Sequence, residues 1–298
     1  MRAIALLLAI VFLTSCAHSG AADVQQTAVS QRVTLYRQQA AEIVTLELGE
    51  YIEGCLFGEL SPSCHEEALK AAAVVIAGNA LYQLQNGDKH CGADYSDSAM
   101  RYISPEEAAL QHGSSYGYYL DKVRSAAEYG MANALTYEGE QVYAPYCAFS
   151  TGRTERGGEP WLPSVEVYAD KDCEQGASSS AWSDTQVMRR LGAVTGVSAL
   201  PARREEWFSD AEYTEGGTLR YIRFGGALLT GAQLREVFGL RSAAVTVEYS
   251  EERFVFRVRG SGDDLGMSLN GAAAMAKGGT TAEQILAYFY PHTVLMPR

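Results

Sequence analysis

Residues 50–60 read Glu-Tyr-Ile-Glu-Gly-Cys-Leu-Phe-Gly-Glu-Leu, and residues 67–74 read Glu-Ala-Leu-Lys-Ala-Ala-Ala-Val. The second stretch belongs to an Ala- and Val-rich run over residues 65–84 that has no continuous polar face. Such a run predicts a helix buried on all sides. Ser61-Pro62-Ser63 predicts a turn that carries the helix N-cap, and Gln85-Asn86-Gly87-Asp88 predicts the end of the helix.

The chain around these stretches mixes expected helices and strands. Residues 45–56 have apolar side chains at both helical and strand spacings, so their type stays open. Further helices are expected over 120–134, 230–238, 271–277 and 281–290, and strands over 135–149 (as a pair), 219–224, 243–248 and 253–258. There is no strict βαβ repeat. We therefore expect a single mixed α+β domain with helices packed on antiparallel strands around a cleft.

A Gly-, Ser- and Pro-rich segment over residues 150–182 predicts a long surface stretch that could line this cleft. The composition is that of a folded chain, with 298 residues, 47% hydrophobic and 20% charged. The formal net charge is −12, and no Lys/Arg stripe offsets it. Phosphate backbones should repel such a surface, which argues against nucleic acid as a partner.

The N-terminus predicts export and lipid anchoring. Arg2 precedes the apolar run Ala3–Leu13, which is shorter than the ~20 residues that a membrane-spanning helix needs. This favours a signal peptide over residues 1–15. The ending Leu13-Thr14-Ser15-Cys16 resembles the lipobox of bacterial lipoproteins, in which the cysteine thiol carries the lipid. The alternative is an ordinary cleaved signal with an incidental cysteine.

The lipobox resemblance implies a membrane partner, because several acyl chains on Cys16 would anchor the protein stably in the cell envelope. Ala17, rather than Asp, follows the cysteine. By the same resemblance this favours the periplasmic face of the outer membrane if the cell has one. We expect a lipidated N-terminus and tether over residues 16–40 and the folded domain over residues 41–298.

The remaining cysteines would sit in an oxidising compartment, where disulfides are permitted. Proximity in sequence suggests Cys55 with Cys64 and Cys147 with Cys173, which leaves Cys91 over. Connectivity cannot be read from sequence, so it stays open.

The opening stretch resembles the stage II sporulation protein D family. That family has a Glu-Tyr-apolar-x-Gly strand, a Glu-Met-Pro turn and a Leu-Lys-Ala-Gln-Ala-Val helix. Later blocks also resemble it, in family order between residues 43 and 295: Phe149–Glu155, Leu228–Ser242, Gly266–Ala276 and Ile285–Thr293. This order over most of the chain makes a chance match a poor explanation.

The resemblance implies a lytic transglycosylase that cuts murein between N-acetylmuramic acid and N-acetylglucosamine, with Glu59 at the catalytic position. A single carboxyl is enough, because the 6-hydroxyl of the muramic acid is a tethered nucleophile and gives a 1,6-anhydro product. Apolar neighbours, Phe57 and Leu60 among them, predict a raised pKa for Glu59. The alternative is a surface turn glutamate.

Substrate contacts are expected from the block that begins at Phe149. Hydroxyls and a guanidinium there could bind a sugar or its lactyl group: Ser150, Thr151, Arg153 and Thr154. Ser268, in the block Gly266-Met267-Ser268, joins this set by resemblance. Tyr146, Trp161 and Trp182 are candidate sugar platforms, with an ordinary core role as the alternative.

Some positions depart from the family pattern. Asp263 and Asp264 stand where the family has His-Gly, and Leu269 stands where it has Gln. The arginine that the family carries in the helix after Glu59 has no counterpart in residues 76–79.

A zinc site found in some members would use His90, but the expected downstream cysteine positions are Ser96 and about Tyr102. Cys91 and Asp94 could replace them, yet a structural zinc takes four firm ligands. We expect no metal and no cofactor.

Three functions stay open at this point. The first is the transglycosylase acting on peptidoglycan glycan strands, which Glu59 favours. The second is a glycan-binding lipoprotein that recruits or enhances a cell-wall amidase, which the departures favour. The third is a structural envelope lipoprotein without a sugar site. A cleft with Glu59 at its floor, near Ser150 and Thr154, would support catalysis.

Overall fold

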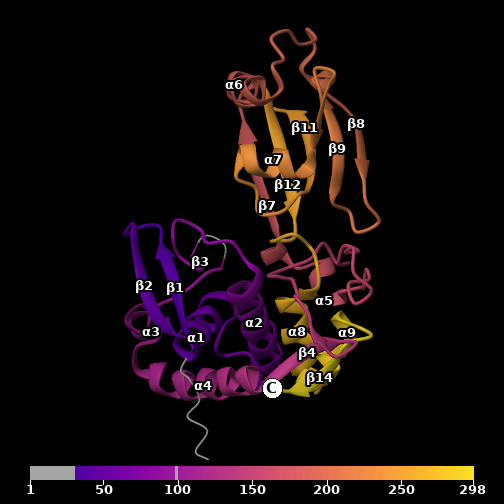
Figure 1. The fold of residues 1–298 in the computed structure, drawn as a ribbon. Helices are drawn as coiled ribbons and strands as arrows, with labels where there is room; N and C mark the ends of the chain where they lie inside the picture. Colours follow the sequence, from indigo (N-terminus) through magenta and orange to yellow (C-terminus); the bar gives the residue numbers. More distant parts are fainter. Residues whose placement is uncertain (1–30, 98–99) are drawn as a thin grey trace, which may run out of the picture. The chain divides into compact units, whose positions relative to one another are not determined.

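The computed structural model describes residues 31–97 and 100–298, whose helices and strands are drawn in Figure 1, and Gln31–Arg298 form one unit. The expected signal peptide and Cys16 lie outside the described residues. The unit starts before the expected boundary at residue 41, because β1 (Arg32–Arg37) already buries Val33 and Leu35. Within the described ranges, every helix is too short or too polar to cross a membrane.

The unit begins with a small sheet. β1 pairs antiparallel with β2 (Glu42–Glu47) and parallel with β3 (Tyr95–Ser96). Helices then follow over the next part of the chain: α1 (Leu48–Glu59), α2 (Glu66–Asn86), α3 (Pro105–His112), the 3-10 turn η1 (Gly113–Ser115) and α4 (Tyr116–Ala132).

α1 corrects the strand and turn that the family pattern implied for residues 50–60. Tyr51, Ile52, Cys55 and Leu56 are all fully buried. That spacing belongs to one face of a helix, whereas a strand would bury alternate residues. Glu59 is accordingly the last residue of α1 rather than part of a turn.

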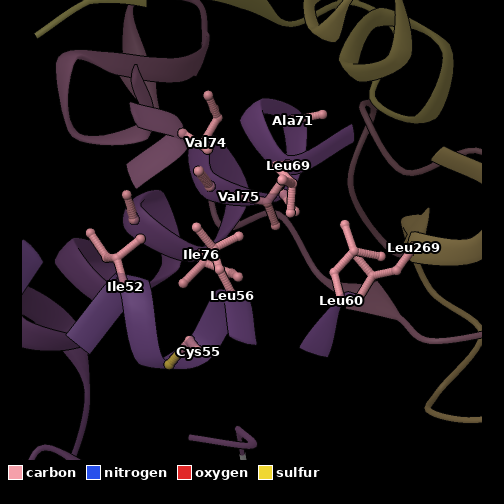
Figure 2. Packing of buried hydrophobic residues seen from close by; sticks show 14 of the residues in the cluster. Ile52, Cys55, Leu56, Leu60, Leu69, Ala71, Val74, Val75, Ile76 and Leu269 are labelled. Carbon is pink, nitrogen blue, oxygen red and sulfur yellow. The ribbon is translucent and has the colours of Figure 1, made fainter. Parts of the chain in front are cut away.

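α2 is the buried helix that its Ala- and Val-rich sequence predicted. Every residue from Ala71 to Ala80 is buried. α2 packs against α1, α4 and two later helices, α8 (Leu269–Lys277) and α9 (Ala282–Phe289). Figure 2 shows Leu56 of α1 next to Ile76 of α2 in this core. The N-cap is His65 instead of the expected turn serine, and its Nδ1 accepts a hydrogen bond from the backbone N–H of Glu67 at 3.3 Å.

A second hydrophobic core lies among antiparallel strands and two helices, where aromatic side chains such as Phe224, Phe254 and Phe256 are buried. One sheet has the order β11-β12-β7 and another the order β10-β9-β8. The elements are β7 (Ala177–Trp182), α6 (Asp184–Thr195), η3 (Arg204–Glu206), β8 (Phe208–Tyr213), β9 (Leu219–Phe224), β10 (Ala227–Thr230), α7 (Gly231–Phe238), β11 (Ala244–Ser250) and β12 (Arg253–Arg259). The expected α+β class is confirmed.

The other elements close the core around α2. The hairpin expected around Glu138-Gly139 is formed by β4 and β5, and β14 pairs with β4. β6 pairs in parallel with β13, directly before α8. Their bounds are β4 (Asn133–Tyr137), β5 (Glu140–Gln141), β6 (Tyr146–Cys147), α5 (Tyr168–Lys171), η2 (Glu174–Gly176), β13 (Met267–Ser268), α8 (Leu269–Lys277), α9 (Ala282–Phe289) and β14 (Val294–Pro297).

All cysteines in the described part of the chain are free thiols. Cys55 and Cys147 are buried, whereas Cys64 and Cys173 are half-buried and Cys91 is exposed. The pairings suggested by proximity, Cys55 with Cys64 and Cys147 with Cys173, are therefore not formed in this structure.

The packing of α4 on α2 gives a first prediction. A Cβ atom at Gly130 of α4 would lie 2.5 Å from the backbone carbonyl of Ala73 on α2. Gly130→Ala must push the two helices apart, and we expect it to lower the free energy of unfolding by about 1–3 kcal/mol. Urea unfolding of the purified protein measures this change.

Gly117→Ala is the matched control in the same helix, since a Cβ atom there meets nothing within 4 Å. It should stabilise the protein by up to about 1 kcal/mol through helix propensity. Equal unfolding midpoints for the two variants would contradict this account of the α2–α4 contact.

Candidate functional site

Glu59 lines a cleft of about 340 Å³. The walls come from segments far apart in the sequence: the end of α1, Asn79 of α2, the segment around β6, Arg235 of α7, Arg241 and the loop after β12. The lining residues are Glu59, Asn79, Met100, Tyr143, Pro145, Tyr146, Cys147, Ala148, Arg235, Arg241, Ser261, Gly262, Asp263 and Leu265.

Glu59 is half-buried at the C-terminal end of α1. Its Oε1 accepts a hydrogen bond from the backbone N–H of Arg101 at 2.7 Å. Gly58 permits this approach, because a Cβ atom there would lie 2.0 Å from the carbonyl oxygen of Arg101. Burial raises the pKa of Glu59, and the hydrogen bond from Arg101 offsets part of that rise. The carboxyl is therefore more readily held as an acid than a glutamate in water.

Two arginines and an aspartate face the same cleft. Arg235 forms an ion pair with Asp263, whose side chain is 74% exposed. Arg241 donates a hydrogen bond from Nη1 to the carbonyl oxygen of Gln175 at 2.8 Å. In residues 31–97 and 100–298, no carboxylate forms an ion pair with Arg241. A carboxylate on a bound molecule could therefore pair with this guanidinium.

Ser150 and Thr154 do not line the Glu59 cleft, contrary to the arrangement expected from sequence. Both are buried. The backbone N–H and Oγ of Ser150 each donate to Asp170 Oδ2 at 2.7 Å. Thr154 Oγ1 accepts from the backbone N–H of Val165 at 3.0 Å. These side chains hold the surrounding chain in place rather than facing a ligand.

Thr151 and Arg153 lie in a different groove, of about 1080 Å³. Arg153 forms ion pairs with Glu166 at 2.8 Å and with Glu215 at 3.4 Å. Thr151 Oγ1 donates to the carbonyl oxygen of Gly216. The segment expected to bind substrate is therefore divided between a buried set and a set in this second groove, and neither set lies in the Glu59 cleft.

Ser268 and Leu269 belong to the start of α8. Ser268 is buried and caps the helix, with its Oγ accepting from the backbone N–H of Gly271 at 3.0 Å. Leu269 is buried in the same core as Leu60 (Figure 2). Where the family has a polar Gln, this chain therefore has an apolar side chain that completes its core.

Of the three expected aromatic platforms, Tyr146 lines the cleft. Burial raises its pKa, with a further contribution from the charge of Glu59. Trp161 packs on Tyr137 at a ring distance of 5.1 Å, and Trp182 packs on Phe238 at 5.3 Å. Tyr143 also lines the cleft. It was not among the residues expected from sequence, because nothing in its local sequence distinguishes it from the many other tyrosines.

Asp264 is buried, whereas its neighbour in sequence, Asp263, is exposed. Ser242 Oγ donates to its Oδ2 at 2.9 Å, whereas its Oδ1 has no hydrogen-bond partner. Burial raises the pKa of Asp264 from 3.8 to about 7. The two aspartates that replace the family's His-Gly pair therefore differ in environment, since Asp263 is exposed and Asp264 is buried.

The described residues contain no group of three or more His, Cys, Asp or Glu side chains that could hold a metal ion. Of the residues weighed as zinc ligands, Asp94 is already engaged. Its Oδ2 accepts from the backbone N–H of Thr34 at 2.8 Å and from Thr34 Oγ1 at 2.6 Å.

The chain is similar in sequence to known proteins of one family. Residues 36–137 match the family described as "Stage II sporulation protein", a range that includes α1, α2 and Glu59. Stage II sporulation protein D of Bacillus subtilis (strain 168) is 27% identical over 295 residues, covering 94% of this chain and 82% of that protein. The protein of the same name from Bacillus amyloliquefaciens is 25% identical, covering 87% of this chain and 76% of its own length.

A further relative is described as an amidase enhancer of Bacillus subtilis (strain 168). It is 23% identical over 298 residues, which cover 82% of this chain but 40% of that longer protein. The similarity therefore extends beyond the range of the family match to most of the chain.

The buried carboxyl of Asp264 predicts a pH-dependent stability. The native state holds this proton up to about pH 7, whereas the unfolded chain releases it near the ordinary value of 3.8. Stability should therefore fall as the pH rises through this window. Asp264→Asn removes this contribution. The free energy of unfolding of wild type should therefore fall relative to that of Asp264→Asn between pH 4 and pH 8. The fall should be at most about 4 kcal/mol, at about 1.4 kcal/mol per pKa unit.

Urea unfolding at several pH values measures this difference, and Asp121→Asn in α4 is the control. Asp121 is exposed and is not among the charged groups that shift the pKa of Asp264, so this substitution should leave the pH dependence of wild type unchanged. Parallel pH profiles for wild type and Asp264→Asn would contradict the assignment.

Proposed function

The chain belongs to the stage II sporulation protein D family, as its sequence blocks predicted, and we propose that it is a peptidoglycan lytic transglycosylase. It cleaves the bond between N-acetylmuramic acid and N-acetylglucosamine in murein glycan strands. The observation that carries the proposal is Glu59, a half-buried carboxyl with a raised pKa on the wall of a cleft. A carboxyl held as an acid is what protonation of a glycosidic oxygen requires.

The reaction needs one carboxyl. Glu59 donates its proton to the glycosidic oxygen as the bond to the muramic acid C1 breaks. The 6-hydroxyl of the same sugar attacks C1, and its proton passes to the Glu59 carboxylate. The products are a 1,6-anhydro sugar and a new chain end, and Glu59 is an acid again. The tethered hydroxyl replaces the second carboxylate that hydrolysing glycosidases use.

Other groups of the cleft suit this substrate. Tyr146 offers an aromatic ring close to Glu59, and Arg241 offers a guanidinium that no carboxylate of the described residues neutralises. Sugars bind aromatic rings through their C–H faces, and a guanidinium binds the carboxyl of a lactyl group.

A second candidate function is that of a glycan-binding protein that recruits or enhances a cell-wall amidase. The similarity to the amidase enhancer favours it. So do the departures from the family pattern: Leu269 lies in the core where the family has Gln, and Asp263 and Asp264 stand where it has His-Gly. Glycan binding without cleavage would then be the useful property of the cleft.

We also propose that Cys16 carries the lipid and anchors the protein in the cell envelope. The support is the sequence Leu13-Thr14-Ser15-Cys16, which lies outside the described residues. In Cys16→Ser, signal and tether are unchanged but the thiol is lost. Detergent-free fractionation of expressing cells should then move the protein from the membrane to the soluble fraction.

Cys91→Ser is the control, because Cys91 is exposed on the folded unit and should not carry lipid. Retention of Cys16→Ser in the membrane fraction would show that another feature holds the protein there.

Glu59→Gln tests catalysis directly. Gln matches the shape of Glu but has no proton to donate, so turnover should fall by about 10²–10⁴-fold. Purified murein, intact and amidase-treated, is digested and the products are read by mass spectrometry for anhydro sugars. Glu53→Gln is the matched control on the same helix. Glu53 pairs with Arg124 at 3.2 Å and does not line the cleft, so this variant should keep wild-type activity.

The outcomes separate the two candidate functions. Anhydro products from wild type but not from Glu59→Gln would support the enzyme. If wild type co-sediments with murein but yields no products, the transglycosylase proposal is rejected in favour of the binding protein.

A further inference from the structure

Tyr143 presents an exposed aromatic ring in the Glu59 cleft. Tyr143 is 47% exposed, whereas the other ring of the cleft, Tyr146, is half-buried. Tyr82 of α2 lies beside it, with the ring centroids 5.6 Å apart, and is itself 38% exposed. Tyr82 is not among the residues that line the cleft. The pair therefore continues an aromatic surface from the cleft onto α2.

The backbone that carries Tyr143 is held firmly. Asn79 of α2 is buried and clamps the next residue, Ala144, through two hydrogen bonds of 2.8 Å, one to its N–H and one to its carbonyl oxygen. The carbonyl oxygen of Tyr143 accepts a further bond from Trp161 Nε1 at 3.3 Å. Asn79 and Tyr82 are three residues apart, so one face of α2 fixes both the backbone and the ring of this tyrosine.

This arrangement has the properties of a binding platform. Exposing an apolar ring to water is unfavourable, so a ligand that covers the two neighbouring rings gains free energy. The backbone that carries Tyr143 is already fixed by the bonds of Asn79 to Ala144, so little backbone freedom is lost on binding. The ligand that suits such rings next to an acid, two arginines and an amide has apolar C–H faces and polar edges, which is the chemistry of a pyranose ring.

We infer that Tyr143, supported by Tyr82, forms a stacking subsite for an N-acetylhexosamine ring of the glycan strand. This subsite adjoins the glycosidic bond whose oxygen Glu59 protonates. This inference rests on the proposed function for the identity of the strand. It adds a binding role for two tyrosines that do not take part in the chemical step. The ring, rather than the hydroxyl, makes the contact.

Binding is measured apart from turnover in the Glu59→Gln protein. A soluble N-acetylglucosamine tetramer is titrated by calorimetry. Tyr143→Ala in this background should raise the dissociation constant about tenfold, whereas Tyr143→Phe should leave it within about twofold of the parent value. Tyr82→Ala should give a smaller loss than Tyr143→Ala, because it removes only the support. On murein with active Glu59, Tyr143→Ala should raise KM and leave kcat unchanged.

Tyr118→Ala is the matched control. Tyr118 is 70% exposed and pairs with Tyr119 at the same ring distance of 5.6 Å, but it lies outside the Glu59 cleft. It should change neither binding nor KM. Unfolding midpoints of all variants establish that the losses do not come from misfolding.

The outcomes distinguish this inference from the proposed function. If wild type releases no anhydro sugar but the tetramer binds in a Tyr143-dependent way, the subsite stands and the transglycosylase falls. If wild type cleaves murein and Tyr143→Ala changes neither KM nor tetramer binding, the subsite falls and the transglycosylase stands. No tetramer binding by the Glu59→Gln protein would also overturn the subsite.

Discussion

Burial of α2 on every side is the constraint on which the rest of the structure depends. From Ala71 to Ala80 the helix has no solvent face, so neighbouring helices and the β4 hairpin must surround it. Small side chains let them approach closely, as Gly130 does against Ala73. Asn79 is the polar exception within this stretch, and its two bonds to Ala144 fix the segment that forms one wall of the cleft. α2 therefore supports both the packing of the core and one wall of the cleft.

Sequence reasoning predicted the elements whose signals are local. α2, α7 and β9 have clear periodicity or capping residues, and each lies within a few residues of its expected bounds. The type of α1 stayed open in the sequence because its spacing fits both a helix and a strand, and only the packing partners on α2 decide between them. α6 is not predicted from sequence, because it directly follows the Gly-, Ser- and Pro-rich segment over residues 150–182, which indicates a surface stretch.

The site was predictable only in part, for a similar reason. Glu59 came from the family resemblance, and its raised pKa from its apolar neighbours. Ser150 and Ser268 were expected to bind substrate, but a hydroxyl in a Gly- or Ser-rich block can equally cap a helix or bind a buried carboxylate. Tyr143 had no local signal, because its role depends on contacts with α2, far away in sequence.

The lining of the cleft has a consequence for when the protein can act. Glu59 lies early in the chain and Asp263 near its end, and the walls between them come from several distant segments. A chain that is still being synthesised, or that a protease has shortened, lacks part of this enclosure. The cleft around Glu59 is therefore complete only once nearly the whole chain has been made and folded.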